Sequence, residues 1–186
     1  MTRTQDERRG GRRARPPLGD EALRELALAY VSRFATTRAR LRDYLRRKVR
    51  ERGWGGDGPP DFDKLADRLA ELGYVDDAAF ALAKSRSLSA RGYGARRVDQ
   101  ALRAAGVDEG DGEGARALAL TEAAEAALRF ARRRRLGPFA AAPTDPSGRQ
   151  RALAAMVRAG HDFALARAVI DTPPGAEISV EQLLTY

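Results

Sequence analysis

The sequence predicts an all-α protein in which three tandem three-helix repeats stack into an elongated, curved array. Alanine and leucine supply most of the apolar side chains and only 6% of the residues are aromatic, a composition that favours helices over strands. Gly53, Gly106 and Gly160 each follow a helical pattern with apolar residues four and eight positions earlier. A unit therefore recurs about every 50 residues, which is typical of stacked helical repeats.

The first repeat is predicted to span residues 20–75. Asp20 can cap a helix whose apolar stripe recurs at i, i+3, i+4 and i+7 up to Phe34. Thr36 or Thr37 can cap a second helix, which ends at Gly53. After a glycine- and proline-rich loop, a third helix runs from residue 61 to 73. Ahead of this repeat, residues 1–19 hold six arginines and no apolar periodicity, and we expect a disordered basic tail that is dispensable for folding.

The second and third repeats are predicted at residues 76–117 and 118–171, and residues 172–186 are predicted to be a C-terminal tail with at most one helical turn. In the second repeat, Gly110, Gly112 and Gly114 predict only a short, poor helix near 108–117, because each glycine costs about 1 kcal/mol relative to alanine. A better helix is expected in the third repeat, with Leu120 on its apolar stripe.

The charge balance points to an anionic macromolecular partner. A net charge of +8 favours nucleic acid or a nucleoprotein. The absence of cysteine excludes disulfides, thiolate metal sites and cysteine nucleophiles. No apolar run is long enough to span a bilayer, so we expect a cytoplasmic protein that does not contact membranes.

The residues that could carry catalysis have simpler structural interpretations. His161 is the only histidine and stands at a helix-ending corner, where the ring is expected to pack or to be solvated. Asp76 and Asp77 stand at a predicted helix start, where carboxylates satisfy free backbone N–H groups. We therefore expect a binding protein rather than an enzyme, with no catalytic residue, no cofactor and no metal.

Two arginine clusters are the candidate contact surfaces for the partner or for DNA. The first lies at a glycine-rich corner and consists of Arg91, Tyr93, Arg96 and Arg97. Its tyrosine can instead be a core residue at a helix start, and that is the interpretation we slightly favour for the ring. The second cluster lies at a helix C-terminus, where cations also suit the helix dipole, and consists of Arg129, Arg132, Arg133, Arg134 and Arg135. Four consecutive helical arginines cover every side of a helix, so they cannot all avoid solvent.

A longer motif links the first two repeats. Residues 72–80 read LGYVDDAAF, Ser85-Arg86 follow, and residues 91–98 read RGYGARRV. This pattern resembles the RecX family of recombination regulators, and the resemblance extends over about residues 20–171. It implies three stacked three-helix units that bind the RecA nucleoprotein filament on single-stranded DNA. It also implies inhibition of strand exchange, ATP hydrolysis and co-protease activity, without a cofactor or catalytic residues.

The sequence departs from the family pattern at three places. The helix that ends at Gly53 is one turn longer, the glycines at 110–114 weaken a helix, and His161 replaces an aromatic residue, which predicts looser packing. The competing hypothesis is a stand-alone basic helical nucleic-acid-binding protein, and an adaptor for helical peptides fits the charge less well. A monomer is expected, and weak direct binding to DNA is left open.

Overall fold

The computed structural model describes residues 16–184, and these residues confirm the all-α prediction. The predicted tail up to residue 15 and residues 185–186 lie outside the described residues. The helices are α1 (Asp20–Val31), α2 (Arg38–Arg52), α3 (Phe62–Glu71), α4 (Asp77–Ala90), α5 (Ala95–Arg103), α6 (Glu109–Thr121), α7 (Ala123–Arg134), the 3₁₀ turn η1 (Gly137–Phe139), α8 (Pro146–Arg158), α9 (Phe163–Asp171) and α10 (Val180–Leu183).

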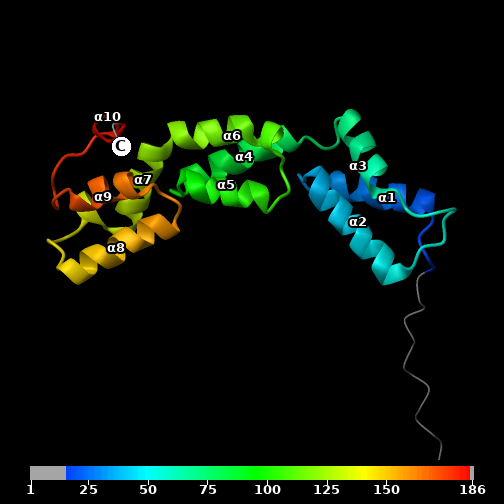
Figure 1. The fold of residues 1–186 in the computed structure, drawn as a ribbon, viewed down its shortest axis with the longest axis horizontal. Coiled ribbons are helices and arrows are strands. Elements are labelled where there is room, and N and C mark those ends of the chain that lie inside the picture. Colours follow the sequence, from blue (N-terminus) through cyan, green and yellow to red (C-terminus); the bar gives the residue numbers. More distant parts are fainter. Residues whose placement is uncertain (1–15, 185–186) are drawn as a thin grey trace, which may run out of the picture.

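The helices are arranged as an elongated, bowed array (Figure 1). Helices α1–α3 lie at one end, α4–α6 lie in the middle, and α7–α10 lie at the other end. Each group has its own cluster of buried side chains, centred on Leu41 and Leu45, on Val98 and Leu102, and on Met156. An array with three separate cores buries apolar surface mainly between near neighbours, as helical repeats do.

The glycines from which the repeat was predicted lie at the ends of helices. Their backbone has a positive φ, a conformation that favours glycine. Gly106 has a φ of +68° and Gly160 has a φ of +94°. Both also lie against a neighbouring group: a Cβ at Gly106 would be 2.3 Å from the Cβ of Ala39, and one at Gly160 would be 2.4 Å from the backbone nitrogen of Arg97. These glycines therefore end the helices and allow the groups of helices to approach each other closely.

The joint between the first two groups consists of side chains at the start of α2 and of α4. Thr37 caps α2 and donates its hydroxyl to the carbonyl of Ala105 at 2.6 Å. Asp76 caps α4 as its position predicts, whereas Asp77 is buried and pairs with Arg38 at 3.5 Å. The structural interpretation of both aspartates fits these contacts, because each one satisfies donors at or near a helix start.

The N-terminal tail was predicted too long. Leu18 is fully buried in the core of the first group, although the sequence predicted disorder up to residue 19. Its backbone N–H donates to Gly53 O, and its carbonyl accepts from Gly55 N–H, both at 2.9 Å. A single apolar residue next to two prolines has no periodicity, so only the tertiary contact shows that it belongs to the fold. A chain beginning at Asp20 would lack this contact.

The C-terminal tail also packs on the protein. Leu183 of α10 is 4% exposed and joins the buried cluster of the third group, with Ile178 and Val180 against it. Ser179 and Gln182 cap the N-terminus of α10 with reciprocal side-chain to backbone hydrogen bonds, a capping box. This arrangement corrects the expectation of a tail at 172–186, because the segment contributes apolar surface to the core.

The helix around the three glycines is longer than predicted. Instead of a short helix near 108–117, α6 continues to Thr121, so the predicted boundary at residue 117 falls inside it. Leu120 consequently belongs to α6 and is 67% exposed, contrary to the expected buried stripe. A Cβ at Gly112 would be 2.3 Å from Nη1 of Arg116, whose side chain reaches Asp99 at 2.8 Å. Packing and this ion pair therefore outweigh the low helix propensity of the glycines.

The stripe of the first helix also ends earlier than predicted. Because α1 stops at Val31, Phe34 lies outside the helix and is 56% exposed rather than buried. Its ring contacts Tyr30 at 5.4 Å between centroids, and Tyr30 in turn stacks on Tyr44 at 4.1 Å.

Candidate functional site

Three residues of the first arginine cluster, Arg91, Tyr93 and Arg97, line a cleft between α4 and α5, whereas Arg96 does not. Helix α4 ends at Ala90, and Gly92 turns the chain with a φ of +76° so that α5 starts at residue 95. The cleft has a volume of about 410 Å³. It is lined by Lys84, Leu88, Arg91, Tyr93, Arg97, Gln100, Ala101 and Ala104. Three cations and no carboxylate line it, so it suits an anionic group.

The aromatic ring in this cleft has both a structural and a surface role. Tyr93 is half-buried and packs against the cores of the second and third groups. The Arg91 guanidinium lies 5.5 Å from the centre of its ring, and Arg97 donates to Gln100 at 2.8 Å. The core interpretation of Tyr93 thus fits the packing, while its contact with Arg91 keeps one part of the ring in the cleft.

The second arginine cluster meets the first one at the joint between the second and third groups. Arg129 donates to the carbonyl of Ser89 at 3.2 Å, and Arg133 donates to the carbonyl of Arg91. These two side chains therefore satisfy carbonyls at the C-terminal end of α4, besides being exposed. Their position in sequence, about 40 residues after the first cluster, gave no indication of this contact.

The remaining arginines of the two clusters lie in different surroundings. Arg96 pairs with Asp162 at 2.7 Å across the joint. Arg132 lies over the ring of Phe139 at 4.9 Å. Arg134 and Arg135 line a separate cleft at the end of α7. The structure therefore brings Arg91, Tyr93, Arg97, Arg129 and Arg133 together and does not bring all nine predicted residues into one site.

Two residues of the α4–α5 cleft, Lys84 and Gln100, were not among the sequence candidates. Their positions follow the helical repeat: Lys84 on α4 lies seven residues before Arg91, which directly follows the end of that helix, and Arg97 and Gln100 are three apart on one face of α5. The signal was therefore present in the spacing, but only the pairing of α4 with α5 shows that these faces form one cleft.

Backbone contacts lock the joint beside the cleft. Gly94 N–H donates to the Ala159 carbonyl at 3.0 Å, and Arg96 N–H donates to the Gly160 carbonyl at 3.1 Å. Next to them His161 is 1% exposed, and its Nε2 bonds the Gly92 carbonyl at 3.1 Å. The joint is therefore a tight backbone-to-backbone contact.

The packing of His161 corrects the expectation of a loose site. Its ring contacts Phe130 edge to face at 5.4 Å, so the imidazole fills an aromatic position. Burial lowers the pKa of His161 to about 4, and the hydrogen bond to the Gly92 carbonyl opposes that shift only in part. The ring is neutral at pH 7 and acts as a packed core residue.

This shift predicts a pH dependence of stability. The unfolded ring binds a proton near its ordinary pKa of 6.5 and the folded ring only near pH 4, so the unfolded state binds more protons between these values. Stability from the neutral ring is complete above pH 6.5 and should fall by about 3 kcal/mol as the pH drops to 4. Urea unfolding at several pH values measures this loss.

The control for this experiment is His161→Phe, which keeps an aromatic ring and removes the only histidine. Its stability should be lower at pH 7, because the bond to Gly92 is lost, but nearly flat between pH 6.5 and 4.5. If both proteins lose stability equally over this range, the histidine is not the cause.

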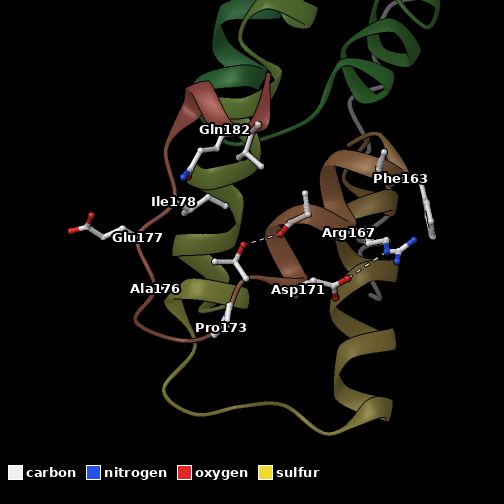
Figure 2. Close-up of a pocket in the computed structure, with 12 residues that line it drawn as sticks. Phe163, Arg167, Asp171, Pro173, Ala176, Glu177, Ile178 and Gln182 are labelled. Atoms are coloured by element: carbon white, nitrogen blue, oxygen red, sulfur yellow. Dashed lines mark hydrogen bonds and ion pairs between the residues drawn. The ribbon is translucent and has the colours of Figure 1, made fainter. Parts of the chain in front are cut away.

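A further pocket of about 820 Å³ lies between α9 and the segment that leads to α10 (Figure 2). Phe163, Arg167 and Asp171 line one side, and Ile178 lines the other. Arg167 pairs with Asp171 at 3.4 Å, and a hydrogen bond from Arg149 keeps the pKa of Asp171 below its usual value. Arg167 is paired with Asp171, and Glu177 adds a negative charge to the lining. This pocket therefore lacks the positive character of the α4–α5 cleft, and it contains none of the predicted contact residues.

Two negative findings apply to residues 16–184. These residues contain no group of three or more histidine, cysteine or acidic side chains placed to hold a metal ion. Nor does any helix within them have the length and apolar character needed to cross a membrane.

Comparisons with known proteins agree with this architecture. Residues 76–115 match the family model of the second three-helix domain of RecX. A regulatory protein RecX from Myxococcus xanthus (strain DK1622) is 35% identical over 185 residues, which cover 91% of this chain and 99% of that protein. A regulatory protein RecX from Thermobifida fusca (strain YX) is 37% identical over 147 residues, covering 77% of this chain and 74% of that protein.

Solved structures show the same fold. The crystal structure of RecX from Lactobacillus salivarius superposes with a TM-score of 0.58 at 17% identity, over 81% of this chain and 93% of that one. A second crystal structure of a regulatory protein RecX gives a TM-score of 0.59 at 20% identity, over 81% and 70% of the two chains. Fold and cleft thus define an all-helical scaffold with a positive cleft between α4 and α5 of the middle group. The chain belongs to the RecX family of regulatory proteins.

Proposed function

We propose that the chain binds the RecA nucleoprotein filament on single-stranded DNA and lowers its recombinase, ATPase and co-protease activities. It acts as a monomer in the cytoplasm, in recombination, DNA repair and the SOS response, and it performs no catalysis itself. The observation that carries this proposal is the α4–α5 cleft, in which Lys84, Arg91 and Arg97 present positive charge without a lining carboxylate. Membership of the RecX family supports the choice of partner.

The shape of the molecule supports binding to a filament rather than to a single small ligand. The three groups of helices form one elongated, bowed body (Figure 1), so it can contact neighbouring subunits of a repeating partner at the same time. Contacts that are individually weak add up when one rigid scaffold presents them together. The protein should therefore act on assembled filaments rather than by removing free DNA.

The test is an ATPase assay with preformed RecA filaments and substoichiometric amounts of this protein. Inhibition is expected, and it should survive an excess of free single-stranded DNA. Replacing both Lys84 and Arg97 with Glu should raise the amount of protein needed for half inhibition several-fold, because the cleft then carries acidic groups. Helicity should not change, because Arg97 is exposed and Lys84 is only half-buried.

The matched control is Arg86→Glu. Arg86 is exposed on α4 but lies two residues from Lys84, on the opposite side of the helix, and it does not line the cleft. It should inhibit like the unchanged protein. Inhibition that disappears when free DNA is added, and that needs enough protein to coat the strand, would support a stand-alone nucleic-acid-binding protein instead.

A further inference from the structure

The two joints between the groups of helices are built from different interactions. At the joint between the second and third groups, only Glu122 separates α6 from α7, and Tyr93 packs against the buried clusters of both groups. Backbone hydrogen bonds, such as the one from Gly94 to Ala159, connect the same two groups. Contacts of this kind carry no net charge, so dissolved salt does not screen them. This joint should therefore keep its geometry as the ionic strength changes.

The joint between the first and second groups lacks this shared apolar packing. The chain passes from α3 to α4 through residues 72–76, which form no helix (Figure 1). Gly73 in this connection has a φ of +77°, and a Cβ there would have no neighbour within 4 Å. Among residues 16–184, no side chain packs against both the first and the second buried cluster. The orientation of the first group therefore depends mainly on the polar contacts at the joint.

One arginine makes most of these polar contacts. The guanidinium of Arg38 lies 3.5 Å from the carboxylate of Asp77 at the start of α4. It also lies 3.4 Å from the carboxylate of Asp108 and 2.6 Å from that of Asp111, both at the start of α6. The Arg38 side chain is 33% exposed, so dissolved ions screen these pairs. We infer that Arg38 and these three aspartates form an ionic lock, which fixes the first group in the bowed arrangement and opens as the ionic strength rises.

The position of Arg38 in its own helix indicates a role at the joint. Arg38 is the first residue of α2, where the positive end of the helix dipole disfavours a cation. The three aspartates, by contrast, cap α6 or lie in the first turn of α4 or α6, where the dipole favours carboxylates whether or not Arg38 is near. Opening the lock therefore places Arg38 in water and leaves the aspartates stabilised by their own helices.

A buried hydroxyl next to the ionic lock also favours opening. Thr36 directly precedes Thr37 at the joint and is 5% exposed, and its Oγ1 has no hydrogen-bond partner among residues 16–184. A buried hydroxyl without a partner destabilises the state in which it is buried, and turning the first group outward exposes it to water. The bowed arrangement therefore has a cost that the ionic lock offsets.

The ionic lock gives the protein two arrangements. In the closed one, the three groups form the single bowed body of Figure 1, which presents its contacts together. In the open one, the first group turns independently of the other two, and its contacts no longer add to theirs. This control of shape goes beyond the proposed binding to RecA.

The experiment measures energy transfer between two fluorescent labels in single molecules of the full chain. The chain has no cysteine, so exposed alanines can be replaced by cysteine and labelled selectively. Ala29 of α1 and Ala117 of α6 span the locked joint, and Ala117 and Ala154 of α8 span the other joint. From about 0.1 M to about 1 M NaCl, the Debye length falls from about 10 Å to about 3 Å. Transfer across the locked joint should then shift to lower efficiency with a broader distribution, whereas transfer across the other joint should stay constant.

Arg38→Gln should show at low salt the distribution that the unchanged protein shows at high salt, because it removes the guanidinium. Asp111→Asn removes the partner at 2.6 Å and leaves α2 unaltered, and it should act in the same direction. Arg42→Gln is the matched control. Arg42 lies about one turn later in α2, its side chain is 30% exposed, and it pairs with Asp63 inside the first group at 2.7 Å. It should keep the salt response of the unchanged protein.

Two results would overturn the inference. One is transfer across the locked joint that does not respond to salt in the unchanged protein. The other is an Arg42→Gln variant that opens this joint as much as Arg38→Gln does, which would mean that any loss of charge from α2 loosens it. Circular dichroism checks the helicity of each variant, and if Arg38→Gln loses helicity, Asp111→Asn decides the question. Because the assay contains no RecA, its outcome is independent of the ATPase test.

Discussion

Leu102→Asp is expected to unfold the middle group of helices. Leu102 is fully buried in α5 and belongs to the cluster that contains Val98 and Ala105. The substitution places a carboxylate among apolar side chains where it has no partner, at a cost of several kcal/mol. Because the outer groups contact the middle one, through Asp77 on one side and Gly94 on the other, the damage should spread to both.

Circular dichroism on heating and urea unfolding measure this effect, with a fall in the free energy of unfolding of about 5 kcal/mol or complete loss of cooperative melting. Leu120→Asp is the matched control, because it makes the same change in the same group at a position that is 67% exposed. It should alter stability by less than about 0.5 kcal/mol. Equal melting of the two variants would mean that α5 does not bury the side that contains Leu102.

Gly94→Ala is expected to separate the second and third groups of helices. A Cβ at Gly94 would lie 2.3 Å from the Gly160 carbonyl oxygen and 2.5 Å from the His161 backbone nitrogen. These are backbone atoms, which cannot turn aside as a flexible side chain can. The substitution should therefore break the hydrogen bonds from Gly94 to Ala159 and from Arg96 to Gly160. Overpacking and the two lost bonds together should cost about 4 kcal/mol.

Small-angle scattering should show a longer or more variable particle, and hydrogen exchange should become faster at the Gly94 and Arg96 amides. Gly110→Ala is the control, because its nearest neighbour would be Asp108 Oδ1 at 3.8 Å. Alanine at that exposed position in α6 should stabilise the protein by about 1 kcal/mol. Unchanged scattering and exchange in Gly94→Ala would show that the joint can shift to accept a methyl group.

The helices were predictable where their signals are local. The stripe of Leu41, Leu45 and Val49 predicts α2, and Asp61 and Asp76 accept the backbone hydrogen bonds expected of helix caps. Period and capping depend on residues within one or two turns, so a single sequence contains the whole signal. Charge is likewise local, and both arginine clusters were visible without a structure.

The errors at Leu18, at Leu183 and in α6 share one cause, which is packing against residues distant in sequence. Leu18 and Leu183 lack periodic neighbours, yet each one packs on helices that the local sequence does not specify. Helix α6 contains three glycines and still runs from Glu109 to Thr121, because it packs against α4 and because Arg116 pairs with Asp99. Tertiary packing contributes more than the propensity of a few residues, so it decides where such segments begin and end.

By itself the sequence determined that the chain is helical, repeated and basic, since these properties follow from composition, short spacings and the count of charges. Only the tertiary structure decided which arginines line a surface cleft and which ones bond to backbone carbonyls within the fold. Arg129 and Arg133 bond carbonyls about 40 residues away, whereas Arg134 and Arg135 line a cleft without an ion pair among the described residues. The physical reason is that a guanidinium interacts with whatever the fold brings within a few ångströms, and the joints between the helical groups set those neighbours.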